Sequence, residues 1–298
     1  MRYQKTIKKS ISGRGVGLHS GKDVNITLRP AVTDTGIVFK RVDLPGSPSV
    51  KAVCDYVSDT RLATTIKKGD ATVATVEHLM AAFSLMRIDN AIVEIDGPEV
   101  PIMDGSASFF VKMIKEAGII DQEGFRRYIV VKRPVMVESS GSEAAIYPAA
   151  ESRITCSVDF NHQALEPQSL TVSTLSVVFE EDISDARTFG FLKDIDILKA
   201  NGLALGGSLE NAVVIDESGI INEEGLRFPD ELVRHKVLDS IGDLYLMGSP
   251  VIGHFMSYKG GHTLTHKLVS KLLSDTESWE YLEFKEETRS QREKTRTG

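Results

Sequence analysis

The chain has 298 residues, of which 41% are hydrophobic and 26% are charged, and its formal net charge is −7. This composition is typical of a globular protein with an ordinary core, and the acidic balance argues against a nucleic-acid partner, which would require a basic surplus. No apolar run approaches the roughly 18 residues of a membrane span, so we expect a cytoplasmic protein without a transmembrane segment. The two cysteines, Cys54 and Cys156, are far apart in the sequence and favour reduced, buried thiols over a disulfide framework.

The first part of the chain predicts strands, then a helix, a strand and a second helix. GRGVG (13–17) lacks the spacing of a dinucleotide-binding loop and predicts a glycine-rich turn. Thr75 is the expected N-cap of the first helix, and Ser106 and Gly118 bound the second. The expected elements are strands within 3–12, 24–30 and 36–43, a helix in the second half of 70–90, a strand over 91–96 and a helix over 106–118.

A polar stretch at 121–128 predicts a domain junction, because the same order of elements then starts again. We therefore expect an α+β fold of two similar two-layer domains, 1–122 and 127–279, packed together with the active site at their interface. Residues 285–298 predict a flexible tail. The expected elements are strands within 129–138, 144–149, 153–160 and 175–182, a helix from about 187, an apolar glycine-rich stretch over 203–216, a helix over 229–248, a strand over 251–259 and a helix over 262–275.

The segment RHKVLDSIGDLYL (234–246) places His235, Asp239 and Asp243 four residues apart. On a helix these three side chains span about 80° of one face, with Lys236 beside them. A polar stripe of this kind is often only the solvated face of a helix. However, His and Asp at this spacing can also bind one metal ion from adjacent turns, and the stripe has a single basic residue. The residues alone leave both interpretations open.

Glu77 and His78, in TVEHLMAAF (75–83), fall in the first turn of the expected helix. If His78 binds a metal, Glu77 would lie beside it, close to a water on the metal. Three protein ligands and one open position are typical of catalytic zinc, although neither HExxH nor HxxEH is present. His262 follows two glycines at the start of a helix, where either an exposed acid–base group or a simple helix cap is expected.

Eight segments of the chain, in this order, carry a family resemblance. They are GVGLHSG (15–21), TVEHLMAA (75–82), IDNAIVEIDGPEVPIMDGSA (88–107), DFNH (159–162), ARTFGF (186–191), LGGSLENAVVID (205–216), RHKVLDSIGDLYL (234–246) and YKGGHTLTHKL (258–268). These blocks resemble the zinc-dependent UDP-3-O-acyl-N-acetylglucosamine deacetylases, from about residue 3 to about residue 275. The resemblance implies two paired βα-sandwich domains, each with a small insert. It also implies one zinc ion per chain and the hydrolysis of the substrate's N-acetyl group to acetate and a free amine, the committed step of lipid A biosynthesis in Gram-negative bacteria. We expect a monomer.

Matching these motifs residue by residue implies a set of site residues. The implied zinc ligands are His78, His235 and Asp239. The implied catalytic residues are Glu77 as general base, His262 as general acid, Asp243 as the carboxylate that orients His262, Thr188 as a donor to the oxyanion and Lys236 at the side of the substrate. Whether Glu77 alone or Glu77 with His262 handles the proton transfers is left open.

By the same resemblance, the insert at about 190–216 implies an apolar passage for the 3-O-acyl chain, where each buried CH₂ contributes about 0.8 kcal/mol. Its expected wall residues are Phe191, Leu203, Ala204, Gly206 and Val214. Phe160 matches a position that stacks on uracil, Lys259 one that meets the diphosphate, and Leu18 one that lines the site.

The sequence departs from the family pattern at two places, and two alternative functions remain open. The loop 138–145 has no Lys or Arg where some relatives place a diphosphate contact, and Ala63 stands where some carry Cys. A zinc amidase that acts on another N-acylated compound and a metal-free nucleotide-sugar-binding relative are the alternative functions. The sequence does not decide the acyl-chain length, the choice between zinc and iron, or the oligomeric state.

Overall fold

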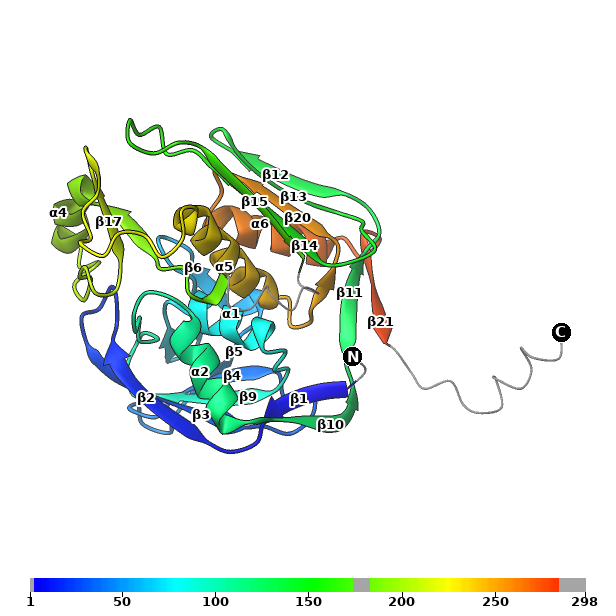
Figure 1. Ribbon diagram of the computed structural model, residues 1–298. Coiled ribbons are helices and arrows are strands. Elements are labelled where there is room, and N and C mark those ends of the chain that lie inside the picture. Colours follow the sequence, from blue (N-terminus) through cyan, green and yellow to red (C-terminus); the bar gives the residue numbers. More distant parts are fainter. Residues whose placement is uncertain (1–2, 174–182, 284–298) are drawn as a thin grey trace.

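Two five-stranded sheets of the same topology form opposite sides of the molecule, and helices lie between them (Figure 1). The computed structural model describes residues 3–173 and 183–283, so the strand expected at 175–182 and the tail at 285–298 lie outside the described residues. Within the described part, no helix combines the length and the apolar character needed to cross a bilayer. The cysteines Cys54 and Cys156 are both buried and free.

The N-terminal sheet has the strand order β2-β3-β9-β4-β5, in which only β9 and β4 are parallel neighbours. Its strands are β2 (Ile11–Val16), β3 (Asp23–Pro30), β9 (Ala91–Ile95), β4 (Ile37–Arg41) and β5 (Ser49–Lys51). Helix α1 (Glu77–Leu85) comes just before β9 in the chain, and α2 (Ser108–Ala117) comes after it.

The C-terminal sheet repeats this arrangement with the order β12-β13-β20-β14-β15, in which only β20 and β14 are parallel neighbours. Its strands are β12 (Val135–Ser139), β13 (Ser142–Tyr147), β20 (His254–Tyr258), β14 (Arg153–Val158) and β15 (Gln168–Ser173). Helix α5 (Glu231–Tyr245) precedes β20, and α6 (His262–Ser274) follows β19 and β20. The expected fold of two similar βα sandwiches is therefore confirmed.

Each half also carries a small three-stranded insert. The first insert is β6 (Val57–Asp59), β7 (Thr65–Lys68) and β8 (Ala71–Val73), and it follows the short 3₁₀ helix η1 (Cys54–Tyr56). The second is β16 (Phe189–Phe191), β17 (Val213–Asp216), β18 (Gly219–Ile220) and the helix α4 (Leu192–Ala200). The remaining strands are β1 (Tyr3–Ile7), β10 (Ile119–Phe125), β11 (Arg127–Val131), β19 (Val251–Ile252) and β21 (Trp279–Glu283).

The stretch expected as a polar domain junction is folded into two strands. Strand β10 pairs with β1, and β11 follows it after a single residue, Arg126, which is buried and donates a hydrogen bond to Asp89 at 2.7 Å. The predicted boundaries at 122 and 127 fall within β10 and at the first residue of β11, and they stay a prediction.

Several local expectations are wrong, among them the start of the second helix, because α2 begins at Ser108 after the N-cap Ala107 and not at Ser106. The first four residues of GRGVG, 13–16, lie in β2 and not in a turn, and Gly17 follows the strand. Gly15 lets a neighbouring segment approach the strand closely, because a Cβ there would lie 2.9 Å from the sulfur of Met103. Thr75 does not cap α1, because its hydroxyl donates to Glu99 instead, at 2.9 Å. The helix expected from about 187 starts only at Leu192, since the preceding residues form β16 and pair with β17.

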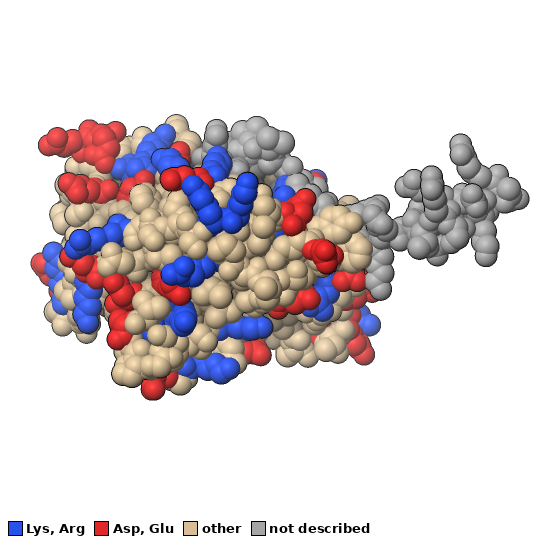
Figure 2. Space-filling model, turned by 90° about the horizontal axis from the view of Figure 1, so that it is seen from below, with Lys and Arg blue, Asp and Glu red and all other residues tan. Residues whose placement is uncertain are grey.

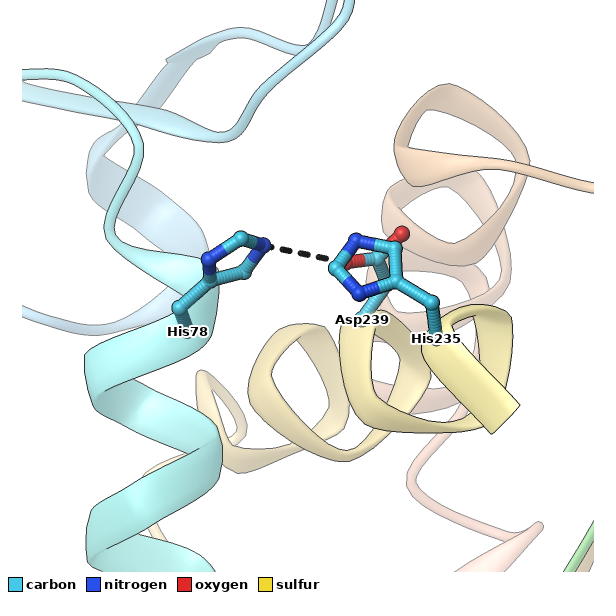
Figure 3. A group of neighbouring side chains, drawn as sticks. All are labelled: His78, His235 and Asp239. Carbon is cyan, nitrogen blue, oxygen red and sulfur yellow. Dashed lines mark ion pairs between the residues drawn. The ribbon is translucent and has the colours of Figure 1, made fainter. Parts of the chain in front are cut away.

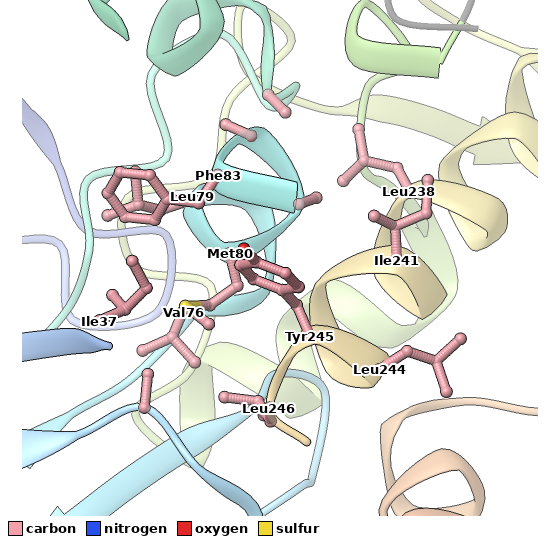
Figure 4. Packing of buried hydrophobic residues seen from close by; sticks show 14 of the residues in the cluster. Ile37, Val76, Leu79, Met80, Phe83, Leu238, Ile241, Leu244, Tyr245 and Leu246 are labelled. Atoms are coloured by element: carbon pink, nitrogen blue, oxygen red, sulfur yellow. The ribbon is translucent and has the colours of Figure 1, made fainter. Parts of the chain in front are cut away.

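Helices α1 and α5 pack against each other at the centre of the molecule (Figure 4). Apolar side chains from both helices, including Met80 of α1 and Ile241 and Tyr245 of α5, belong to one buried cluster. Gly242 makes this contact possible, because a Cβ there would lie 2.0 Å from the backbone oxygen of Glu77. The fold therefore brings the first turn of α1 against the last third of α5.

The outer surface is mixed in charge on the face seen from below, where acidic and basic side chains are interspersed (Figure 2). Pairs on the N-terminal sheet include Arg29 with Glu94 at 2.6 Å and Arg14 with Asp23 at 3.1 Å. Exposed pairs of this kind contribute little to stability but keep a surface free of a large field of one sign.

Candidate metal and active site

His78 of α1 and His235 and Asp239 of α5 point toward one another (Figure 3). Each offers one ligand atom, and these atoms lie within 4.8 Å of one another. Asp239 Oδ1 is 3.6 Å from His78 Nε2 and 3.3 Å from His235 Nε2. All three side chains are buried, so the interpretation of the α5 stripe as a solvated face is wrong. The stripe is covered because α1 and the neighbouring elements pack over it.

The ring of His235 is held so that one nitrogen remains available to a metal. Its Nδ1 lies 3.0 Å from the backbone oxygen of Ala186, and a proton there is donated to that oxygen. The Nε2 atom, which faces Asp239, then carries the lone pair. Burial lowers the pKa of His235 to about 3, so the imidazole is neutral, as a metal ligand must be.

Asp239 supplies an ionised oxygen that has no hydrogen-bond donor among the described residues. Burial on its own would raise the pKa of this carboxyl, but the positive charge of Lys236 helps to hold it well below its usual range. Lys236 Nζ donates to Asp239 Oδ2 at 2.6 Å, whereas Asp239 Oδ1 is buried and has no hydrogen bond among the described residues. A divalent cation would satisfy that oxygen, and two imidazoles with one carboxylate form a donor set typical of catalytic zinc.

Glu77 and His262 lie beside the metal-ligand group and close to each other. Glu77 Oε1 is 3.8 Å from His262 Nε2, and both side chains are buried. Burial raises the pKa of Glu77. His262 Nδ1 donates to Asp243 Oδ2 at 2.8 Å. Burial alone would lower the pKa of His262, but the carboxylates of Asp243 and Glu77 outweigh it and raise this pKa to about 10.

His262 was expected either as an exposed acid–base group or as a simple helix cap, and both the exposure and the cap are wrong. Only 8% of the residue is exposed. It is the first residue of α6, whose N-cap Gly261 precedes it, and its ring binds Asp243 of α5 instead of capping its own helix. The buried ion pair with Asp243 links α6 to α5.

A cavity of about 710 Å³ opens over these groups. Of the residues expected in the site, those that line it are Leu18, Glu77, His78, Phe160, Thr188, His235, Lys236, Asp239, Lys259 and His262. Asp243 lies behind His262. The loop 138–145, which has no Lys or Arg, contributes Ser139 and Ser142 to the wall of this cavity. Ala63 is buried. The structure therefore brings the expected catalytic and metal-binding residues to one place.

A second, mostly apolar cavity of about 690 Å³ continues from the first, and the two share Leu18, Leu62, Thr188 and Phe189 in their walls. The insert formed by α4 and β16–β18 surrounds it, with Phe191, Ala204 and Val214 among the lining residues. Leu203 and Gly206 do not line it. The backbone of Gly206 packs on the turn after β2, where a Cβ would lie 2.3 Å from the oxygen of Gly17.

Sequence reasoning missed Thr64, which is buried between the two halves. Its backbone N–H donates to Glu77 Oε2 at 3.0 Å, and its hydroxyl donates to Asp243 Oδ1 at 2.6 Å. The second contact joins residues 179 positions apart, and TRLATT (60–65) carries no periodic or motif signal that would predict it. Leu62, at the junction of the two cavities, was missed for the same reason.

Comparison with known proteins gives a consistent result. The family model "UDP-3-O-acyl N-acetylglycosamine deacetylase" (LpxC) matches residues 4–274. A UDP-3-O-acyl-N-acetylglucosamine deacetylase of Myxococcus xanthus is 52% identical over 93% of this chain and 88% of its own length. Proteins of the same name from Syntrophus aciditrophicus and Pseudomonas entomophila are 48% and 47% identical, over 94% and 95% of this chain and 89% and 94% of their own lengths. The chain belongs to the UDP-3-O-acyl N-acetylglycosamine deacetylase family.

Proposed function

We propose that this chain hydrolyses the N-acetyl group of UDP-3-O-acyl-N-acetylglucosamine, giving acetate and UDP-3-O-acyl-glucosamine, the committed step of lipid A biosynthesis. One zinc ion per chain, bound by His78, His235 and Asp239, is part of this proposal. The observation that carries it is the presence of three features in two adjoining cavities that share wall residues: a His–His–Asp group, a buried acid–base pair and an apolar passage. The names of the relatives supply the substrate.

In this reaction the metal, when bound, supplies a Lewis acid that polarises the acetyl carbonyl and makes water more acidic. Glu77 takes the proton from the attacking water, and its raised pKa makes it a stronger base. Thr188, in the wall of the cavity, donates to the oxygen on which negative charge develops. Lys236 keeps Asp239 ionised and oriented through its 2.6 Å hydrogen bond.

His262 protonates the leaving nitrogen as the C–N bond breaks. The support for this role is its raised pKa, which keeps the imidazole charged at neutral pH, and its place on the cavity wall beside Glu77. Asp243 fixes the ring through Nδ1, so that Nε2 faces the cavity side where Glu77 lies. The two proton transfers are thereby divided between two groups.

The substrate contacts complete the proposal. The apolar passage takes the 3-O-acyl chain along Phe191, Ala204 and Val214. Phe160 packs edge-on against Phe189 and Phe191 at the opening and offers its face to the uracil. Lys259, which pairs with Asp159 at 2.7 Å, meets the diphosphate.

A single chain supplies every proposed ligand and acid–base group, which supports a monomer as the active unit. Two buried free thiols, Cys54 and Cys156, support a reducing compartment, the cytoplasm.

The direct test is acetate release from UDP-3-O-acyl-N-acetylglucosamine, with metal content measured on the same purified sample. We expect about one zinc per chain and chelator-sensitive turnover. Glu77→Gln should keep the metal and lose about 100-fold or more in kcat, because only the proton acceptor is removed. A metal-free protein that binds the nucleotide sugar without releasing acetate would contradict the proposal, and so would full activity of Glu77→Gln.

A further inference from the structure

We infer that Thr64 is a positioning residue that holds the two carboxylates of the acid–base machinery, Glu77 and Asp243, in place from one point. This inference rests on the proposed deacetylase function and deepens it. Thr64 lies between β6 and β7 in the first insert, and only 1% of it is exposed. It makes no contribution to the wall of the catalytic cavity, so its action is through other residues.

Three polar atoms of Thr64 form hydrogen bonds with α1, with α5 or with Val76, the residue before α1. The backbone N–H donates to Glu77 Oε2 at 3.0 Å, and the backbone oxygen accepts from Val76 N at 3.2 Å. The hydroxyl donates to Asp243 Oδ1 at 2.6 Å, a length typical of an O–H group bound to an ionised carboxylate. Thr64 thus ties the first turn of α1 to the last third of α5.

The Thr64 hydroxyl supplies the second hydrogen bond that orients the Asp243 carboxylate. Its other oxygen, Oδ2, accepts from His262 Nδ1 at 2.8 Å. With one donor on each oxygen, the carboxylate plane is set, and the ring of His262 is set with it. Without the hydroxyl, the carboxylate would keep one donor and could turn about its last side-chain bond, taking the imidazole away from the position in which Nε2 faces Glu77.

Solvent cannot readily replace the hydroxyl. Behind Thr64 and Asp243 lies a space of only about 10 Å³, walled by Cys54, Val57, Leu246, His266 and Val269. A space of this size is at the lower limit for one water molecule. Loss of the hydroxyl therefore leaves a buried carboxylate oxygen without its donor, and the effect should be felt in turnover more than in substrate binding.

Thr64→Val tests the hydroxyl alone, because valine has nearly the same shape and keeps both backbone hydrogen bonds. We expect kcat to fall by about 10- to 100-fold with KM changed by less than about twofold and with zinc content unchanged. Thr64→Ser should restore kcat to within about threefold of the wild type, since it returns the donor. If Thr64→Val fails to fold, Thr64→Ser and Thr64→Ala form a second pair that differs only in the hydroxyl.

A double-mutant cycle separates positioning from a general structural effect. If Thr64 acts through Asp243, then Thr64→Val should change kcat by less than about twofold in an Asp243→Ala background. Equal losses in both backgrounds, or wild-type kcat in Thr64→Val, would overturn the inference. A wild-type protein that releases no acetate would instead overturn the proposed function, so the two failures are distinguishable.

Discussion

Glu77 and His262 lie 3.8 Å apart, and the proposed division of the proton transfers between them rests on their different surroundings. Burial raises the pKa of Glu77, whereas the carboxylates beside His262 outweigh burial and raise its pKa to about 10. An ionised carboxylate next to a charged imidazole is the favoured state of this pair at neutral pH, and it supplies one proton acceptor and one proton donor. The two opposite charges attract each other, so a substitution of either residue alters the pKa of the other.

The pH dependence of kcat should reveal the role of Asp243. His262 is useful when protonated, so activity is present below its pKa and is lost as pH rises through it. Asp243→Asn removes a negative charge that raises this pKa, and the descending limb of the profile should move to lower pH. Asp121→Asn, an exposed carboxylate in β10, is the matched control and should leave the limb in place. An unmoved limb in Asp243→Asn would remove His262 from the role of general acid.

Helical periodicity predicted the existence of α1, α2, α5 and α6 well, but it could not tell whether the polar stripe of α5 was exposed. His235, Asp239 and Asp243 are buried because their partners come from α1, α6 and the first insert, and these contacts are invisible in a local pattern. Segment ends were missed for a related reason. The hydroxyl of Thr75 donates to Glu99 and does not cap the helix. Glu99 lies 24 residues away, so a local pattern cannot predict this contact.

At Gly242 the backbones of the two central helices approach each other closely, and this contact predicts a measurable cost of substitution. Helix propensity alone would favour alanine by about 1 kcal/mol. However, the new Cβ would lie 2.0 Å from the backbone oxygen of Glu77 and would push α1 away from α5. We expect Gly242→Ala to lower the free energy of unfolding by about 3 kcal/mol or more, measured by denaturant titration.

Gly190 provides the control for this experiment, because a Cβ there meets nothing within 4 Å. Gly190→Ala should change the free energy of unfolding by no more than about 1 kcal/mol. If Gly242→Ala were as stable as the wild type, the close packing of α1 on α5 could not be what positions Glu77.

Across the whole molecule, two halves with matching sheets face each other, and each contributes part of the site. The repeated order of strands and helices predicted this architecture although the two halves share no evident sequence repeat. The family motifs predicted which residues meet, and the structure brings them together. Thr64 and Leu62 could not be predicted, since their importance arises only when the first insert is packed against the second half.

The central claim is that His78 from one half and His235 and Asp239 from the other bind a single metal ion. Anomalous diffraction at the zinc absorption edge, on crystals of the metal-loaded protein, tests it most directly. The expected result is one peak per chain, about 2.0–2.2 Å from His78 Nε2, His235 Nε2 and Asp239 Oδ1. A zinc peak at any other place in the chain, or an undiminished peak in His78→Ala crystals, would contradict the account.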